Sequence, residues 1–475
     1  MAFHSPRTRT RTRAKLTWLA CGTLLAALAA TLQAEAAPVS VLFVGNSYTF
    51  ARLDPVLSYN AANVRDLTRP QGPLNGGRDP ALAFTTGAPF TNLTGTNSYP
   101  VGTINPTNSQ PFDSYSPHSQ TQGWSGVAGI FKQMTVQAGL DYDVALSTRN
   151  AASLRGHFLN TANSNWDLRG NIASQTWGKV VLQEQSDEPL ARQSGLGSNP
   201  EYFRFYADKV ENFLHSSAAS PTIRDRDAFP GATDAARQAA CVAAGIAAGT
   251  CSNNRGSFSN SNASASTELY LLQTWARPNL INAPGAATID PATGNATYNS
   301  TPPPSFFSSL EAMTAELKAG YQAAMDQADN DGSAGFKGIA PVGEAFLRAV
   351  TSGVATRDMY GAGAASDGLL DLWFNDGTHA SVYGSYLSSL TLFGTLTGLD
   401  PLSLGASEIA ARDLGISAAD ALALQRVASA QLGFGATVPE PGSLALVLIA
   451  ALASMASMSS RAPMAPIASR RASAR

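Results

Sequence analysis

The sequence predicts an α/β fold built on a parallel sheet. Short apolar runs rich in β-branched residues alternate with stretches of helical periodicity, which is the pattern of successive β-α-β units. The first run, Val39 to Val44, is apolar almost throughout, as a strand buried inside a parallel sheet must be. We find no internal repeat and no second alternating set, so the pattern indicates one domain.

The remaining elements follow in chain order. Further strands are expected at Tyr142–Ser147, Val180–Leu182, Glu268–Gln273 and Gly338–Val342. Helices are expected from Tyr48 towards Val64 and over Val127–Ala138, Tyr202–Phe213, Phe306–Ala328, Gly343–Val350 and Ser381–Leu396. Two segments rich in Gly, Pro, Asn, Ser and Thr, about 68–122 and 222–266, are interpreted as loop insertions in a catalytic domain over residues 37–430.

Residues 1–36 have the pattern of a secretory signal peptide. Residues 7–15 are basic, residues 16–32 are apolar, and Ala34-Glu35-Ala36 offers a small-x-small cleavage site. A lipoprotein anchored at Cys21 is the alternative, disfavoured because Cys21 lies early in the apolar stretch. The catalytic domain is therefore expected outside the cytoplasm.

Residues 438–475 have the pattern of a sorting tail. Val438-Pro439-Glu440-Pro441 precedes an uncharged apolar run over 442–460, long enough to span a bilayer, and arginines follow it. This arrangement resembles the PEP-CTERM tail of Gram-negative bacteria that make extracellular polysaccharide. The resemblance implies transient anchoring in the inner membrane, processing by an exosortase-type enzyme, and an extracellular or cell-surface destination. A permanent membrane anchor is the alternative.

Cysteine use and charge narrow the class of protein. Cys241 and Cys251 lie in a small-residue segment, and in an oxidising compartment they are expected to form a disulfide that closes a surface loop. Lys+Arg 32 nearly balance Asp+Glu 34, and much of the basic charge lies in the two ends, so no nucleic-acid partner is expected. The acidic run Asp326, Asp329 and Asp331 fits a helix-ending turn better than a calcium loop, because the required glutamate is missing. We expect no metal or cofactor.

Two short strings far apart in the chain supply the parts of a serine hydrolase. The first strand runs into Gly45-Asn46-Ser47-Tyr48-Thr49, where a sharp turn would present Ser47 at the carboxyl edge of the sheet. Asp376 precedes His379 by three residues, close enough to hydrogen-bond one imidazole nitrogen and leave the other to accept a hydroxyl proton. The sequence thus predicts a triad of Ser47, His379 and Asp376.

These strings resemble the SGNH (GDSL-like) hydrolase superfamily, in the branch whose nucleophile motif reads G-N-S-[FY]-T. The match covers Gly45 to Thr49, and Asp376-Gly377-Thr378-His379-Ala380-Ser381 with Gly384-Ser385-Tyr386-Leu387. The resemblance implies a flavodoxin-like three-layer α/β/α sandwich and ester hydrolysis through an acyl-enzyme. An α/β-hydrolase would keep the same order of triad residues, but it needs a glycine where Thr49 stands.

The resemblance also implies an oxyanion hole with three donors. One is the backbone N–H of Ser47. A second is a backbone N–H from a glycine block, which falls near residues 149–154, where Ala151 or Ala152 replaces the glycine; we assign Ala152. The third is a side-chain amide, for which Gln185 occupies the family's asparagine position.

Three further residues leave alternatives open. Gln183 competes with Gln185 as the side-chain donor, because both would point to the same side of an extended segment. His157 and Trp275 are candidates for substrate contact, with a structural role as the alternative for each.

The sequence as a whole predicts a secreted serine esterase that removes acetyl groups from an extracellular carbohydrate. The substrate is suggested by the association of the sorting tail with polysaccharide-producing bacteria, not by the chemistry of the site. The alternatives are a lipid or short-chain carboxylesterase, and a catalytically silent surface or matrix protein that uses the same fold for binding.

Overall fold

The computed structural model describes residues 37–51, 55–67, 124–159, 167–289 and 296–434. The predicted signal peptide, first insertion and sorting tail lie outside these residues. Within the described ranges, no helix combines the length and apolar character needed to cross a bilayer.

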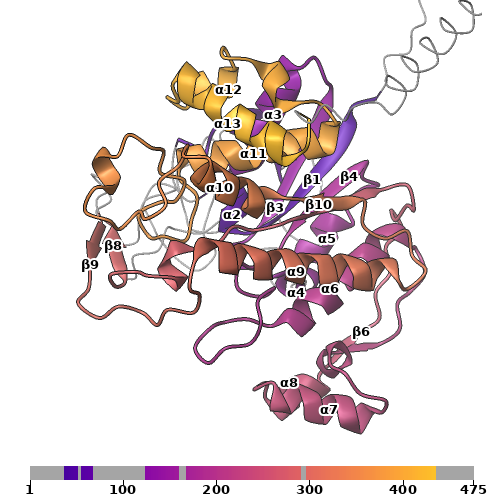
Figure 1. Cartoon of the computed structure of the whole chain (residues 1–475). Coiled ribbons are helices and arrows are strands. Elements are labelled where there is room, and N and C mark those ends of the chain that lie inside the picture. The colour runs from indigo at the N-terminus through magenta and orange to yellow at the C-terminus, as the bar shows by residue number, and fades with distance from the viewer. Residues whose placement is uncertain (1–36, 52–54, 68–123, 160–166, 290–295, 435–475) are drawn as a thin grey trace, which may run out of the picture.

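A six-stranded parallel sheet forms the centre of the molecule (Figure 1). Its order is β10-β7-β4-β1-β3-β2. The strands are β1 (Val39–Gly45), β2 (Arg65–Asp66), β3 (Tyr142–Thr148), β4 (Lys179–Gln183), β7 (Glu268–Leu272) and β10 (Gly338–Ala340). All five predicted strands are therefore present. Without the short edge strand β2, the order is that of a flavodoxin-like, doubly wound sheet.

Helices cover both faces of the sheet, so the predicted three-layer α/β/α sandwich is confirmed (Figure 1). On one face, α3 and α11 pack together, and α10, α12 and α13 pack around them; α4, α5, α6 and α9 cover the other face. The bounds are α3 (Gly126–Gln137), α4 (Leu154–Leu159), α5 (Leu168–Ile172), α6 (Pro200–His215), α9 (Leu310–Asp329), α10 (Val342–Thr351), α11 (Val382–Thr397), α12 (Ile409–Asp413) and α13 (Ala418–Gln431).

Local sequence signals define where the principal helices begin and end. The side chains of Asn199, Ser309 and Ser381 each accept a backbone N–H in the first turn of α6, α9 and α11, respectively. Gly398 ends α11 with a φ of 72°, a left-handed conformation that glycine adopts without strain. The strand β1 is fully buried from Val41 onwards, which fixes it at the centre of the sheet.

The predicted helix from Tyr48 towards Val64 is wrong beyond its first turn. The helix α2 covers only Ser47–Phe50, and Ala51 takes a φ of 60°. A left-handed residue cannot continue a right-handed helix. The next described stretch has turns and a short 3₁₀ segment before β2.

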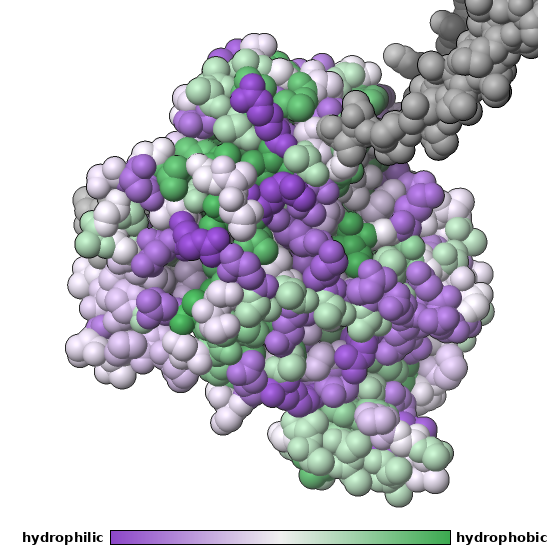
Figure 2. Space-filling model, viewed as in Figure 1, coloured by the Kyte–Doolittle hydropathy of each residue, from purple (hydrophilic) through white to green (hydrophobic). Residues whose placement is uncertain are grey.

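The second insertion, 222–266, is more ordered than the sequence suggested. Its strands β5 (Ile223–Arg224) and β6 (Asn254–Gly256) pair antiparallel, and its helices α7 (Asp234–Ala243) and α8 (Ala248–Ser252) stand away from the main body (Figure 1). The surface of these two helices is largely apolar in Figure 2, which reflects their alanine-rich sequence.

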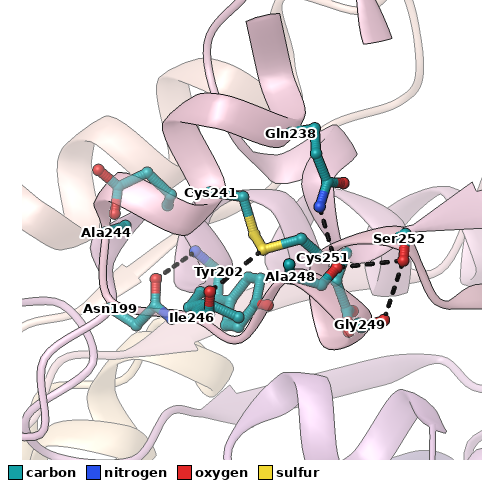
Figure 3. The surroundings of a disulfide bond; sticks show 12 residues. Asn199, Tyr202, Gln238, Cys241, Ala244, Ile246, Ala248, Gly249, Cys251 and Ser252 are labelled. Atoms are coloured by element: carbon teal, nitrogen blue, oxygen red, sulfur yellow. Dashed lines mark hydrogen bonds between the residues drawn. A yellow bond between two sulfur atoms is a disulfide. The ribbon is translucent and has the colours of Figure 1, made fainter. Parts of the chain in front are cut away.

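The predicted disulfide between Cys241 and Cys251 is confirmed and joins α7 to α8 (Figure 3). Both cysteines are fully buried. The Gln238 side-chain amide also connects the two helices, because it donates to the Ala248 carbonyl at 2.9 Å. The disulfide and this hydrogen bond therefore hold the two short helices of the insertion together.

Candidate active site

Ser47 lies at the point where the winding of the sheet reverses. The strand β1 pairs with β3 on one side and with β4 on the other, and Ser47 follows the carboxyl end of β1. In open α/β sheets, ligands bind in the crevice that forms at this position. Asn46 caps α2 by accepting the Tyr48 N–H at 3.1 Å, so the turn directs the chain away from the sheet immediately before the serine.

The three predicted triad residues form a continuous chain of hydrogen bonds. The Ser47 Oγ atom lies 2.8 Å from His379 Nε2, and His379 Nδ1 lies 2.7 Å from Asp376 Oδ2. A carboxylate can only accept, so Nδ1 carries the proton and Nε2 is left to accept from the Ser47 hydroxyl. Asp376 Oδ1 accepts the backbone N–H of His379 at 2.9 Å, which fixes the carboxylate against its own loop.

Aromatic side chains hold the loop that carries Asp376 and His379. Trp275 Nε1 donates to the Thr378 carbonyl at 3.0 Å, and the Tyr298 hydroxyl donates to the Asn375 carbonyl at 3.0 Å. Trp275 is fully buried and stacks on the Tyr48 ring, with ring centroids 4.2 Å apart. Its expected substrate contact is therefore wrong. Trp275 instead connects the loop of the histidine to the residue that follows the nucleophile.

Gln183 positions the nucleophile turn. Its Oε1 accepts the Asn46 N–H at 2.8 Å and the Thr49 hydroxyl at 2.9 Å, and its Nε2 donates to the Glu184 carbonyl. A Cβ on Gly45 would lie 2.5 Å from the Gln183 Oε1, so a glycine is required there. Because Gln183 is fully buried and both ends of its amide are used to hold the turn, the structure gives it a positioning role. Gln183 is the last residue of β4, which pairs with β1. This position next to the nucleophile turn is the sequence signal that could have indicated its positioning role.

His157 is a structural histidine, and the expectation of substrate contact is wrong. It is fully buried, and its Nε2 donates to the Gly45 carbonyl at 2.8 Å. Burial lowers its pKa to about 4, which keeps the ring neutral around neutral pH. His157 therefore holds the carboxyl end of β1, directly before the nucleophile turn, through this hydrogen bond.

The loop after β3 differs from the expected oxyanion geometry. The Ala152 N–H donates to the Arg149 carbonyl at 3.1 Å, so this amide is occupied and its assignment as an oxyanion donor is wrong for this geometry. Ala151 adopts a φ of 53°, the left-handed conformation in which glycine would be unstrained. The Ala152 carbonyl accepts from the Asn46 side-chain amide at 3.0 Å, which ties this loop to the nucleophile turn.

Gln185, the expected side-chain donor, lies in the loop after β4 and is held there through its amide oxygen. Its Oε1 accepts the Asp187 N–H at 2.7 Å, and its Nε2 has no acceptor among the described residues. The neighbouring Glu184 is buried, and its Oε1 accepts the N–H groups of Leu154 at 3.0 Å and of Gln185 at 2.6 Å. Burial and the nearby Glu188 carboxylate raise the pKa of Glu184 well above its usual range. Glu184, which the sequence analysis did not single out, thus joins the loops that follow β3 and β4.

A cavity of about 650 Å³ opens beside the triad. His379 and Asp376 line one side of it, and Arg277 and Asn279 contribute a second wall. The third wall is a segment that flanks the unpredicted hairpin of β8 (Ala287–Ile289) and β9 (Ala296–Tyr298) and includes Asn299, Thr301 and Pro302 to Pro304. His379 and Asp376 of the triad therefore face a space large enough for a small organic substrate.

One group of carboxylates among the described residues is close enough to hold a metal ion. It consists of Asp208, Glu211 and Asp331 and lies away from the triad. The Asn212 amide already bridges Asp208 and Asp331, with donor distances of 3.1 and 2.6 Å. The turn after α9 uses Asp331 to accept the Ser333 N–H at 2.8 Å. These contacts agree with a helix-ending turn.

No family model matches the chain, and no curated protein matches it. Among solved structures, it is similar to a provisionally assigned SGNH hydrolase from Slackia heliotrinireducens, with 14% identity, coverage of 76% of this chain and 99% of the other, and a TM-score of 0.29. It is also similar to a DUF4886 family protein from Bacteroides uniformis, with 11% identity, coverage of 86% and 99%, and a TM-score of 0.34. At such low identities and scores, the fold class rests on the sheet order and layers described above.

Proposed function

We propose that this chain is an exported serine esterase of the SGNH type that removes acetyl groups from an extracellular carbohydrate. The observation that supports the proposal most directly is the uninterrupted hydrogen-bond chain from Ser47 through His379 to Asp376. A serine, a neutral histidine and an orienting carboxylate in this order are the parts that acyl transfer requires.

In the proposed reaction, Ser47 Oγ attacks the ester carbonyl carbon while His379 Nε2 takes its proton. Asp376 stabilises the resulting imidazolium. The negative charge on the carbonyl oxygen would be stabilised by the Ser47 N–H and the Gln185 side-chain amide. Collapse of the tetrahedral intermediate breaks the bond to the alcohol, which leaves with the proton from His379. A water molecule, activated by the same histidine, then hydrolyses the acyl-enzyme and releases acetate.

The lining of the cavity favours a hydrophilic substrate over a lipid. Among the described residues, the walls beside the triad consist of hydrogen-bonding side chains, prolines and small residues, without leucine, isoleucine or phenylalanine. A pocket for an acyl chain would need such large apolar side chains. The proposed signal peptide and PEP-CTERM-like tail add an extracellular destination, where polysaccharide esters occur.

The proposal is tested by assaying the purified mature protein against phenyl acetate, a long-chain phenyl ester and an acetylated methyl glycoside. We expect turnover of the two acetates, little turnover of the long-chain ester, and covalent labelling of Ser47 by a fluorophosphonate. Absence of both labelling and turnover would favour the silent binding protein, and preference for the long chain would favour a lipid esterase.

A further inference from the structure

Arg277 is a largely buried cation beside the triad whose position is fixed by three polar neighbours. Its Nη1 donates to the Ser186 hydroxyl at 2.9 Å and forms an ion pair with Asp187. Its Nε donates to the Asn279 side-chain oxygen at 3.2 Å. Only 12% of the side chain is exposed. Such a guanidinium has little freedom left to lose when it binds a further group.

The remaining nitrogen of Arg277 is available to the cavity. Among the described residues, Nη2 has no hydrogen-bond acceptor, whereas Nη1 and Nε are occupied. Arg277 lines the same cavity as Asp376 and His379. An arginine fixed in this way presents a donor at a defined position next to the reacting centre.

The charges around Arg277 select the kind of oxygen that it can bind. Asp187 already balances the guanidinium, and Asp376 adds a second negative charge that acts on Arg277. A carboxylate entering this space would therefore meet an excess of negative charge, whereas a hydroxyl or ring oxygen would not. Asn279, Asn299 and Thr301 on the cavity wall are likewise uncharged.

The size of the cavity indicates which half of the ester lies there. An acetyl group is far too small to occupy about 650 Å³, so the cavity is available to the alcohol half. Resting on the proposed esterase function, we propose that Arg277 is the specificity-determining residue that binds a neutral oxygen of the alcohol half, so that the enzyme prefers acetylated neutral sugars to acetylated uronates.

The first test needs no variant. The kcat/KM of the wild-type protein is compared for an acetylated methyl glucoside and for the uronate acetylated at the same position. We expect the neutral sugar to be preferred by about 10-fold or more, because the uronate adds a like charge near Asp187 and Asp376. Equal rates, or preference for the uronate, would overturn the inference. If the protein hydrolysed neither sugar ester nor phenyl acetate, the esterase function itself would be contradicted.

The second test measures Arg277 directly. For Arg277→Met, the ratio of kcat/KM for the neutral sugar ester to kcat/KM for phenyl acetate should fall about 10- to 100-fold, since one charge-assisted hydrogen bond is lost. Arg277→Lys should recover part of the ratio. Arg412→Met, at an exposed arginine on α12, is the matched control. A parallel fall on both substrates would indicate a purely structural role and refute the inference.

The third test changes the counter-charge instead of the donor. Asp187→Asn keeps a similar shape but removes the negative charge that balances Arg277. The ratio of kcat/KM for the uronate to kcat/KM for the neutral sugar should therefore rise by several-fold to about 10-fold. This variant keeps the inference testable even if the Arg277 variants fold poorly. An unchanged ratio between the two sugars would contradict the role given to the ion pair.

Discussion

The residues around Ser47 form two groups that are assembled in different ways. We call them the histidine side, with His379 and Asp376, and the glutamine side, with Gln183 and the residues that it joins. His379 and Asp376 come from one loop and lie three residues apart, so their hydrogen bond forms largely within a single short string. The glutamine side combines the turn after β1 with the loops after β3 and β4, joined by Asn46, Gln183 and Glu184. The first arrangement can be recognised from sequence, whereas the second depends on which of several donors and acceptors meet in three dimensions.

The largest expected effect concerns the histidine side. Ser47→Ala should lower kcat by ~10⁴-fold or more and abolish fluorophosphonate labelling, because the nucleophile is removed. Asp376→Asn should also lower kcat severely while leaving Ser47 in place, because the amide no longer holds the correct tautomer of His379. Steady-state kinetics on phenyl acetate measure both. Ser174→Ala, in the turn that follows α5, is the control. Full activity of Ser47→Ala would contradict the triad assignment.

The next effect separates the two glutamines. Gln185→Ala should lower kcat by roughly 10²–10³-fold with little change in KM or stability, because its hydrogen bond strengthens only as charge develops on the oxyanion. Gln183→Ala should instead lower the free energy of unfolding by about 2–3 kcal/mol, because the Asn46 N–H and the Thr49 hydroxyl lose their shared acceptor.

Kinetics and urea unfolding of both variants decide between these roles. A fully active Gln185→Ala together with a stable but inactive Gln183→Ala would exchange the two assignments and leave the triad intact.

A smaller effect is expected where Glu184 joins the two loops. Glu184→Ala leaves the Leu154 and Gln185 N–H groups without their acceptor, so kcat should fall about 10- to 100-fold as the Gln185 loop shifts. Glu184→Gln keeps an oxygen acceptor at the same position, so it should recover most of the loss. Equal losses in both variants would show that the carboxylate charge, not the shared acceptor, matters.

The sequence was sufficient for the sheet and the histidine side because their signals are local. Apolar β-branched runs located all five predicted strands, and Asp376 to His379 is a self-contained string. The early helix was misjudged because the left-handed Ala51 leaves no periodic signal. The hairpin β8–β9 and the helices α12 and α13 lay outside the patterns considered.

The glutamine side could not be predicted because the choice among its amides is made by tertiary contacts. The Ala152 N–H is occupied by a hydrogen bond within its own turn. Gln183, the competing candidate for the side-chain donor, instead bonds to the turn that follows β1. A sequence lists these donors but does not say which acceptor each will meet. His157 and Trp275 were ambiguous for the same reason, since burial decides between a structural role and substrate contact.

The last prediction concerns His157, which bonds to the Gly45 carbonyl before the nucleophile turn, and the pH dependence that it gives to the free energy of unfolding. The pKa of His157 is lowered to about 4 in the folded protein because the ring is buried, whereas an unfolded histidine titrates near its model value of 6.5. Between pH 4 and pH 6.5, the unfolded state binds a proton at His157 that the folded state does not bind. The His157 contribution to the free energy of unfolding is therefore constant above pH 6.5 and is lost as the pH falls from 6.5 towards 4. From pH 7.5 to pH 5 this loss amounts to roughly 2 kcal/mol.

His157→Gln can still donate to the Gly45 carbonyl but does not titrate. The difference in the free energy of unfolding between wild type and variant should therefore narrow by that amount on acidification. Urea unfolding at the two pH values measures it, and buried carboxyls such as Asp208, whose pKa burial raises to about 6, cancel because both proteins contain them. Parallel pH profiles would mean that His157 has the same pKa in the folded and unfolded states, which would contradict the lowered pKa and the buried, neutral ring.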